Sequence, residues 1–116
     1  MRVSGIDHLN IKVADLERSS RFYCGNLGLK EAFREMPDRI FLHCGKDLLT
    51  LAKGKPSGNS AMHFGFQVRN KGEALVWKKW LVSNGAKIDH ARLERAGGAL
   101  YFRDTDDYLV EIFYES

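Results

Sequence analysis

The chain has few of the features that mark secreted, cross-linked or membrane-spanning proteins. Among its 116 residues are only two cysteines, Cys24 and Cys44, and two prolines. Two cysteines so far apart match neither a closely spaced metal site nor the disulfide framework of a small secreted domain, so we expect free thiols. No apolar stretch approaches the roughly 20 residues of a membrane-spanning helix, and residues 1–5 lead into a strand pattern without an apolar leader. We therefore expect a cytoplasmic protein with no membrane contact.

A strong excess of charge is also missing. The 18 basic and 15 acidic residues give a formal net charge of +3, and the basic residues are scattered apart from pairs such as Lys78 and Lys79. Nucleic-acid-binding surfaces usually gather basic residues in a stripe with aromatic ones, so no nucleic-acid partner is expected. Small anionic molecules remain compatible with the weak positive charge. The length and the 44% hydrophobic content predict one folded domain, 1–116.

The first half of the chain predicts a strand, a helix and three more strands. Residues 5–13 alternate between a mostly polar side, which includes His8 and Asn10, and an apolar side. Asp15 is expected to cap a helix that ends before Gly28. The remaining strands are predicted at 29–35, 39–43 and 47–52, with turns at Pro37-Asp38 and Gly45-Lys46.

The second half, after a linker at 53–60, repeats this order. The predicted elements are a strand at 62–68, a helix at 73–84 with an apolar face of Ala74, Trp77, Trp80 and Leu81, and strands at 86–91, 99–103 and 108–114. His8 aligns with His63 at an offset of 55, whereas Phe41 aligns with Phe102 at an offset of 61. We therefore predict an α+β fold of two tandem βαβββ modules, 1–53 and 61–116, whose mixed sheets form a cup-shaped half-barrel with the helices outside.

Three polar positions stand out once the halves are superimposed. A pseudo-twofold axis would place His8 opposite His63, and Glu111 lies between Val110 and Ile112 in an otherwise apolar strand. A carboxylate there needs a partner or a cation, and two imidazoles with one carboxylate suit a divalent metal that keeps open positions for a substrate. The alternative is that both histidines are satisfied by ordinary hydrogen bonds and that Glu111 pairs with a lysine.

Nearly the whole chain resembles the vicinal oxygen chelate superfamily, which includes glyoxalase I, fosfomycin resistance proteins, extradiol dioxygenases, methylmalonyl-CoA epimerase and bleomycin resistance proteins. The segments that carry the resemblance are Ile6-Asp7-His8-Leu9-Asn10-Ile11, Val13-Ala14-Asp15-Leu16, Phe22-Tyr23, Leu27-Gly28-Leu29, His63-Phe64-Gly65-Phe66, Tyr101-Phe102-Arg103-Asp104 and Leu109-Val110-Glu111-Ile112. The resemblance implies a glyoxalase-like fold. It also implies a divalent metal, such as Mn, Fe, Ni or Zn, bound by His8, His63 and Glu111.

The family pattern also restricts the chemistry that we expect. Thr50 occupies the position where glyoxalase I and the epimerase carry a fourth ligand, Glu, which weakens the case for these two reactions. Tyr101 falls where fosfomycin transferases carry an active-site Tyr, but the sequence lacks their C-terminal phosphonate-binding segment and the C-terminal region of many dioxygenases. The turn Asp104-Thr105-Asp106-Asp107 departs from the usual Asp-Pro-Asp-Gly and is interpreted as a variant hairpin.

Two functions follow as expectations. The first is a metal-dependent enzyme of lyase, thiol-transferase, epoxide-opening or dioxygenase type, acting on a small oxygen-chelating substrate. Its further site candidates are Asn10, Thr50, Gln67 and Tyr101 for orienting the substrate, His90 for acid–base chemistry and Arg92 for an anion. The second is a non-catalytic small-molecule-binding protein of the bleomycin-resistance type. A homodimer is expected because family members usually cover their sheet edges in this way.

Overall fold

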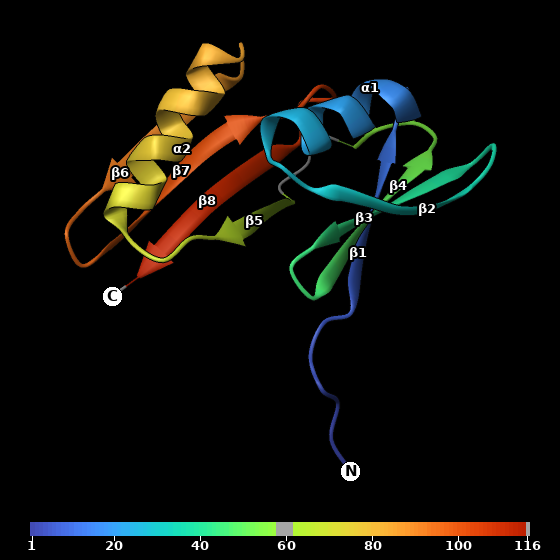
Figure 1. Cartoon of the computed structure of the whole chain (residues 1–116), viewed down its shortest axis with the longest axis horizontal. Coiled ribbons are helices and arrows are strands. Elements are labelled where there is room, and N and C mark those ends of the chain that lie inside the picture. The colour runs from blue at the N-terminus through green and yellow to red at the C-terminus, as the bar shows by residue number, and fades with distance from the viewer. Residues whose placement is uncertain (58–61, 116) are drawn as a thin grey trace. The chain divides into compact units, whose positions relative to one another are not determined.

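The computed structural model describes residues 1–57 and 62–115. Two compact units make up the chain, Met1–Pro56 and Ser57–Ser116, and each is described by itself. Each contains one four-stranded mixed sheet with a helix against it (Figure 1). Within the described residues, no helix is both long enough and apolar enough to cross a membrane.

The first unit has the strand order β1-β4-β3-β2, with β1 parallel to β4 and the other neighbours antiparallel. Its elements are β1 (His8–Val13), α1 (Leu16–Arg21), the π-helical turn η1 (Phe22–Asn26), β2 (Lys30–Glu35), β3 (Arg39–Cys44) and β4 (Asp47–Lys53). The Asp15 carboxylate accepts a hydrogen bond from the Arg18 amide at 3.0 Å and caps α1, as predicted. Gly28, with φ of 72°, follows the helical segment.

The second unit repeats this arrangement with the order β5-β8-β7-β6. Its elements are β5 (His63–Gln67), α2 (Lys71–Ser83), β6 (Lys87–Leu93), β7 (Gly97–Arg103) and β8 (Leu109–Glu115). Asn70 caps α2 through a hydrogen bond from the Glu73 amide at 2.9 Å, and Gly85, with φ of 82°, follows the helix.

The predicted order of elements and the α+β class are confirmed, with differences at particular residues. Residues 5–7 lie outside β1, and the first helix changes to π geometry at Phe22 rather than continuing as one α-helix. Trp80 was expected on the buried face of the second helix, yet it is 48% exposed. Ala74 and Leu81 are the buried residues of α2. Both cysteines are free, as expected.

The repeat extends to strand register and corrects one predicted equivalence. Thr50 pairs with Phe41 in the first unit, and its counterpart Glu111 pairs with Tyr101 in the second. Phe41 therefore corresponds to Tyr101, and the predicted match of Phe41 with Phe102 is wrong. The physical reason is that residues 104–108 connect Arg103 to Leu109, a connection one residue longer than 44–47 between His43 and Leu48.

One face of each sheet forms the core and the opposite face carries most of the polar candidates. In β8 the residues Val110, Ile112 and Tyr114 are at most 1% exposed, and they share the buried interior with residues of α2. Successive side chains of a strand point to opposite faces, so Glu111 lies on the face away from this core. The alternating burial along β8, in which buried Val110 and Ile112 flank Glu111, agrees with this placement.

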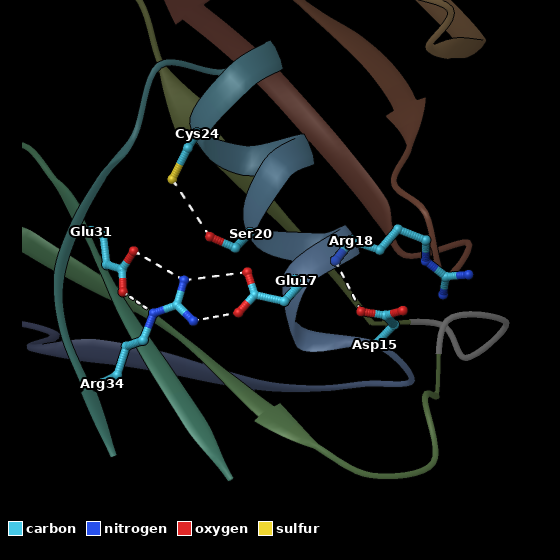
Figure 2. A network of polar contacts seen from close by, with 7 residues as sticks. All are labelled: Asp15, Glu17, Arg18, Ser20, Cys24, Glu31 and Arg34. Atoms are coloured by element: carbon cyan, nitrogen blue, oxygen red, sulfur yellow. Dashed lines mark hydrogen bonds and ion pairs between the residues drawn. The ribbon is translucent and has the colours of Figure 1, made fainter. Parts of the chain in front are cut away.

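An exposed ionic network connects helix and sheet in the first unit (Figure 2). Arg34 of β2 bonds to Glu17 of α1 and to Glu31 of its own strand, with its Nη2 atom 3.3 Å from Glu17 Oε2 and 3.2 Å from Glu31 Oε2. The hydrogen bond from Arg34 lowers the pKa of the Glu17 carboxyl, and the two carboxylates raise the pKa of the guanidinium. The network holds the start of the helical segment against the strand at the sheet edge.

Candidate functional site

The register of the second unit places five of the predicted site residues on one face of its sheet. Residues of neighbouring strands that pair directly point to the same side. Glu111 pairs with Gly65 on β5 and with Tyr101 on β7, and Tyr101 pairs in turn with His90 on β6. The remaining two, His63 and Gln67, flank Gly65 at a distance of two residues along β5. Four adjacent strands thus contribute to a continuous polar strip.

Glu111 is more buried than the two histidines of this strip, and it has partners. Its side chain is 14% exposed, and Oε2 lies 3.6 Å from Nε2 of His63, whose side chain is 47% exposed. A hydrogen bond to the Glu111 carboxylate raises the pKa of the Tyr101 phenol. The lysine partner offered as an alternative for Glu111 is therefore not the arrangement found here. A carboxylate oxygen and an imidazole nitrogen instead point toward one another.

Gly65 leaves room for this carboxylate. A Cβ atom at position 65 would lie 3.1 Å from the Glu111 Cβ and 3.4 Å from its Cγ, which is tighter than ordinary packing allows. The hydrogen atom at this position lets the Glu111 side chain lie across β5 toward His63.

The His90 ring stacks on the ring of Tyr101, with a centroid distance of 4.3 Å and an interplanar angle of 16°. Nδ1 of His90 is 2.7 Å from Oδ2 of Asp89, and Oδ1 of the same carboxylate accepts hydrogen bonds from the Arg103 guanidinium at 3.2 and 3.3 Å. The hydrogen bond with His90 and the one with Arg103 lower the pKa of Asp89. His90 is thus held on one side by a ring and on another by an anchored carboxylate.

A groove of about 560 Å³ continues from this stack toward the β6–β7 turn. His90, Arg92, Tyr101 and Phe113 line it, together with the small residues at 97–99. The turn has no room for a side chain at position 98, because a Cβ atom there would clash with the Arg92 carbonyl oxygen and approach the Tyr114 hydroxyl to 2.9 Å. Arg92 also lines the groove, where its Nε is 3.1 Å from Glu94 Oε1.

The first unit carries the other predicted site residues, His8, Asn10 and Thr50. Nδ1 of His8 is 3.0 Å from Oδ2 of Asp7, and Asn10 pairs with Thr50 across β1 and β4. Thr50 is 2% exposed, and its Oγ1 has no hydrogen-bond partner in the part of the chain that the structure describes. A buried hydroxyl without a protein partner is unusual and suits contact with a ligand or water.

The counterpart of the His90–Tyr101 stack in the first unit is apolar. Phe33 pairs with Phe41, and their rings stack at 4.2 Å with an angle of 15°. A bulge precedes Phe33 at Ala32, as one precedes His90 at Asp89. The same backbone therefore presents two phenylalanines in one unit and a histidine with a tyrosine in the other.

Of the predicted metal triad, His63 and Glu111 lie together in the second unit, and His8 belongs to the first. Across residues 1–57 and 62–115, no group of three or more His, Cys, Asp or Glu side chains is close enough to hold a metal ion. The two donor atoms of the second unit, an imidazole nitrogen and a carboxylate oxygen, fit part of a divalent-metal site. The third ligand remains a prediction.

Sequence reasoning missed Asp7 and Asp89, the two carboxylates that hold His8 and His90. The signal was present, because the dipeptide Asp-His occurs at 7–8 and again at 89–90. Neighbouring residues in a strand normally point to opposite faces, so a direct bond between them was not expected.

Comparison with known proteins places this chain in a family. The model of the Glyoxalase/Bleomycin resistance protein/Dioxygenase superfamily matches residues 5–112. The chain belongs to this family, and thus to the vicinal oxygen chelate superfamily.

Solved structures of similar fold cover almost the whole chain. Lactoylglutathione lyase from Agrobacterium tumefaciens has a TM-score of 0.84 at 21% identity, covering 98% of this chain and 96% of that one. The fosfomycin resistance protein FosX from Mesorhizobium loti has a TM-score of 0.83 at 22% identity, covering 99% and 95%. A glyoxalase/bleomycin resistance protein/dioxygenase from Alicyclobacillus acidocaldarius is 28% identical, with a TM-score of 0.75 and coverage of 99% and 95%. The first two likenesses concern the fold alone.

Proposed function

We propose that this protein is a divalent-metal-dependent enzyme that acts on a small oxygen-chelating substrate. His8, His63 and Glu111 are the metal ligands in this proposal. The observation that carries it is the 3.6 Å approach of Glu111 Oε2 to His63 Nε2 on the sheet face away from the core. Membership of a family whose name includes glyoxalases and dioxygenases supports an enzymatic role.

The surroundings of the ligands support the same assignment. Metal-binding histidines are commonly oriented by a carboxylate on their second nitrogen. Asp7 has this relation to Nδ1 of His8, which leaves Nε2 for the metal, and it is Nε2 of His63 that faces Glu111. A bound divalent ion would act as a Lewis acid that stabilises negative charge developing on a substrate oxygen.

The protein's own groups supply binding and orientation. Tyr101 and Gln67 lie on the strip of the second unit, and Asn10 and Thr50 are paired across strands of the first. In the proposed site they hydrogen-bond polar groups of the substrate, with Thr50 Oγ1 gaining the partner it otherwise lacks. Arg92, in the groove beside His90, attracts an anionic substituent.

The test is a metal-binding measurement with a matched variant. Purified protein is reconstituted separately with Mn²⁺, Fe²⁺, Ni²⁺ and Zn²⁺, and the bound metal is quantified after removal of excess. We expect near one equivalent for the native chain and a large loss for Glu111→Ala. Glu115→Ala, at the exposed end of the same strand, is the control and should retain the metal. Less than about a tenth of an equivalent, with no further loss in Glu111→Ala, would overturn the proposal.

Activity of the reconstituted protein then selects the reaction type. The probes are the hemithioacetal of methylglyoxal and glutathione, an epoxide with water or a thiol, and a catechol. Stoichiometric metal and turnover of one probe support the enzyme proposal. Ligand binding without metal would favour the non-catalytic binding function instead.

Light scattering at micromolar concentration tests the proposed homodimer, which a monomeric mass would contradict.

A further inference from the structure

We infer that Asp89 is a positioning residue that fixes the tautomer of His90 and makes its Nε2 atom a general base directed at substrate in the groove of the second unit. The proton-transfer role rests on the enzyme function proposed above, whereas the tautomer itself does not.

A β-bulge makes this pair possible. Ile88 pairs with Phe102 and His90 with Tyr101, so Asp89 is the extra residue between two consecutive pairs on β7. The bulge breaks the alternation that would send adjacent side chains to opposite faces. The Asp89 carboxylate can therefore reach Nδ1 of the next residue, at 2.7 Å.

The chemistry of the carboxylate decides which nitrogen carries the proton. Hydrogen bonds from His90 and Arg103 lower the pKa of Asp89, so its carboxylate is ionised at neutral pH and can only accept hydrogen bonds. Nδ1 of His90 must then be the donor. In the neutral imidazole this leaves the lone pair on Nε2, which makes no hydrogen bond within residues 1–57 and 62–115.

Further contacts hold both the Asp89 carboxylate and the His90 ring in place. Arg103 holds the other Asp89 oxygen at 3.2 and 3.3 Å and also donates to the Asp107 carbonyl oxygen at 3.1 Å. The Tyr101 ring supports the flat side of the imidazole at 4.3 Å. The charged or titratable groups around His90 and its groove are thus Asp89 and Arg92 on its own strand, Tyr101 and Arg103 on β7, and the carboxylates of Glu94 and Glu115, which also line the groove.

The proton balance of the step is simple. Nε2 takes a proton from an acidic C–H or O–H group of a substrate lying in the groove, and the electron pair of that bond stays on the substrate. The resulting imidazolium is stabilised by the Asp89 carboxylate and returns the proton to the product. His90 lines the groove with a side chain that is 59% exposed, so a small molecule can reach it.

The equivalent bulge of the first unit provides a natural reference. Its extra residue is Ala32, followed by Phe33, and no carboxylate is present there. Asp89→Ala therefore gives the second bulge the residue that the same backbone already carries in the first. This variant should fold, and it removes the carboxylate that orients His90, which is also the acceptor of the Arg103 guanidinium.

The experiment is two-bond ¹H–¹⁵N correlation NMR of the imidazole rings in metal-free protein near pH 7.5. His90 signals are assigned from their absence in His90→Gln. We expect the native His90 to carry its proton on Nδ1, and Asp89→Ala to shift it toward the Nε2–H form that free histidine prefers. Acylation by diethyl pyrocarbonate, followed by peptide mass spectrometry, should slow several-fold at His90 in Asp89→Ala and stay unchanged at the exposed His43.

Asp7→Ala is the matched control, because it removes the other neighbouring Asp–His contact and should alter His8 alone. An Nε2–H tautomer in the native protein, or an unchanged His90 in Asp89→Ala, would overturn the inference. Because these measurements use metal-free protein, they are independent of the metal assay, and either proposal can fail without the other.

Discussion

Gly65 lies directly opposite Glu111 in the parallel pairing of β5 and β8, and its missing side chain leaves the space that the Glu111 side chain uses. The missing side chain has a measurable consequence for the position of the carboxylate.

Gly65→Ala is expected to weaken metal binding about tenfold, because a Cβ only 3.1 Å from the Glu111 Cβ displaces the carboxylate from His63. Isothermal titration with Zn²⁺ or Mn²⁺ measures the dissociation constant. Gly25→Ala is the control, since a Cβ there meets nothing within 4 Å. Equal affinity in Gly65→Ala and the native protein would show that Glu111 does not need this space.

Asp7→Ala should reduce metal affinity by about 10- to 100-fold, because His8 loses the acceptor on Nδ1 that presents Nε2 as a ligand. The same titration checks it. Asp89→Ala, which removes the carboxylate from a histidine outside the proposed ligand set, should leave affinity unchanged. If Asp7→Ala and Asp89→Ala change the metal affinity equally, the assignment of His8 as a ligand and His90 as an acid–base group is wrong.

Asp107→Gly should stabilise the protein by up to about 1 kcal/mol, because Asp107 has a φ of 65°, which glycine adopts without steric cost. Urea unfolding gives the free-energy difference. Asp106→Gly, at the neighbouring position without a positive φ, is expected to be neutral or destabilising, and a gain there as large as at 107 would argue against backbone strain as the cause.

Arg34→Met should reduce the dependence of stability on acid pH. The Arg34 hydrogen bond lowers the pKa of Glu17 in the folded state (Figure 2), so its contribution is present above the unfolded-state pKa and lost as pH falls through the folded one. The native protein should therefore exceed the variant in stability at pH 7, and the gap should narrow below pH 4.

Urea midpoints measured between pH 7 and pH 2.5 test this dependence. Arg39→Met is the control, because its guanidinium reaches Glu35 only at 4.0 Å. A gap between the native protein and Arg34→Met that stays constant over the whole pH range would contradict the assignment of the effect to Glu17.

Much of the fold could be predicted because it depends on local patterns. The sequence singled out Glu111 as a carboxylate between the apolar residues Val110 and Ile112, and the structure buries these two on the opposite face. The cap at Asp15 and the stop at Gly28 located the first helical segment. The sequence specifies the buried face of a helix less sharply than the buried face of a strand. Trp80 was assigned to the buried side from its spacing, yet Ala74 and Leu81 suffice to pack α2 on its sheet.

The strand register and the β-bulges could not be predicted from the sequence. One extra residue in the turn at 104–108 changes the alignment from Phe102 to Tyr101, and a one-residue change in a strand exchanges its buried and exposed faces. The bulge at Asp89 has no reliable sequence signature. For this reason the contact of Asp89 with His90 was not predicted, although the two residues are adjacent in the sequence.

The sequence by itself determined the tandem βαβββ order and the α+β class, because alternation, caps and turn residues act over a few positions. The metal ligands that it predicts stay a prediction. Only the tertiary structure decided which of these residues touch: Glu111 with His63 and Tyr101, and Asp89 with His90 and Arg103. Those contacts depend on the pairing of strands that are distant in the sequence and on one β-bulge. A change of one residue in the strand register would move the partners out of hydrogen-bonding distance.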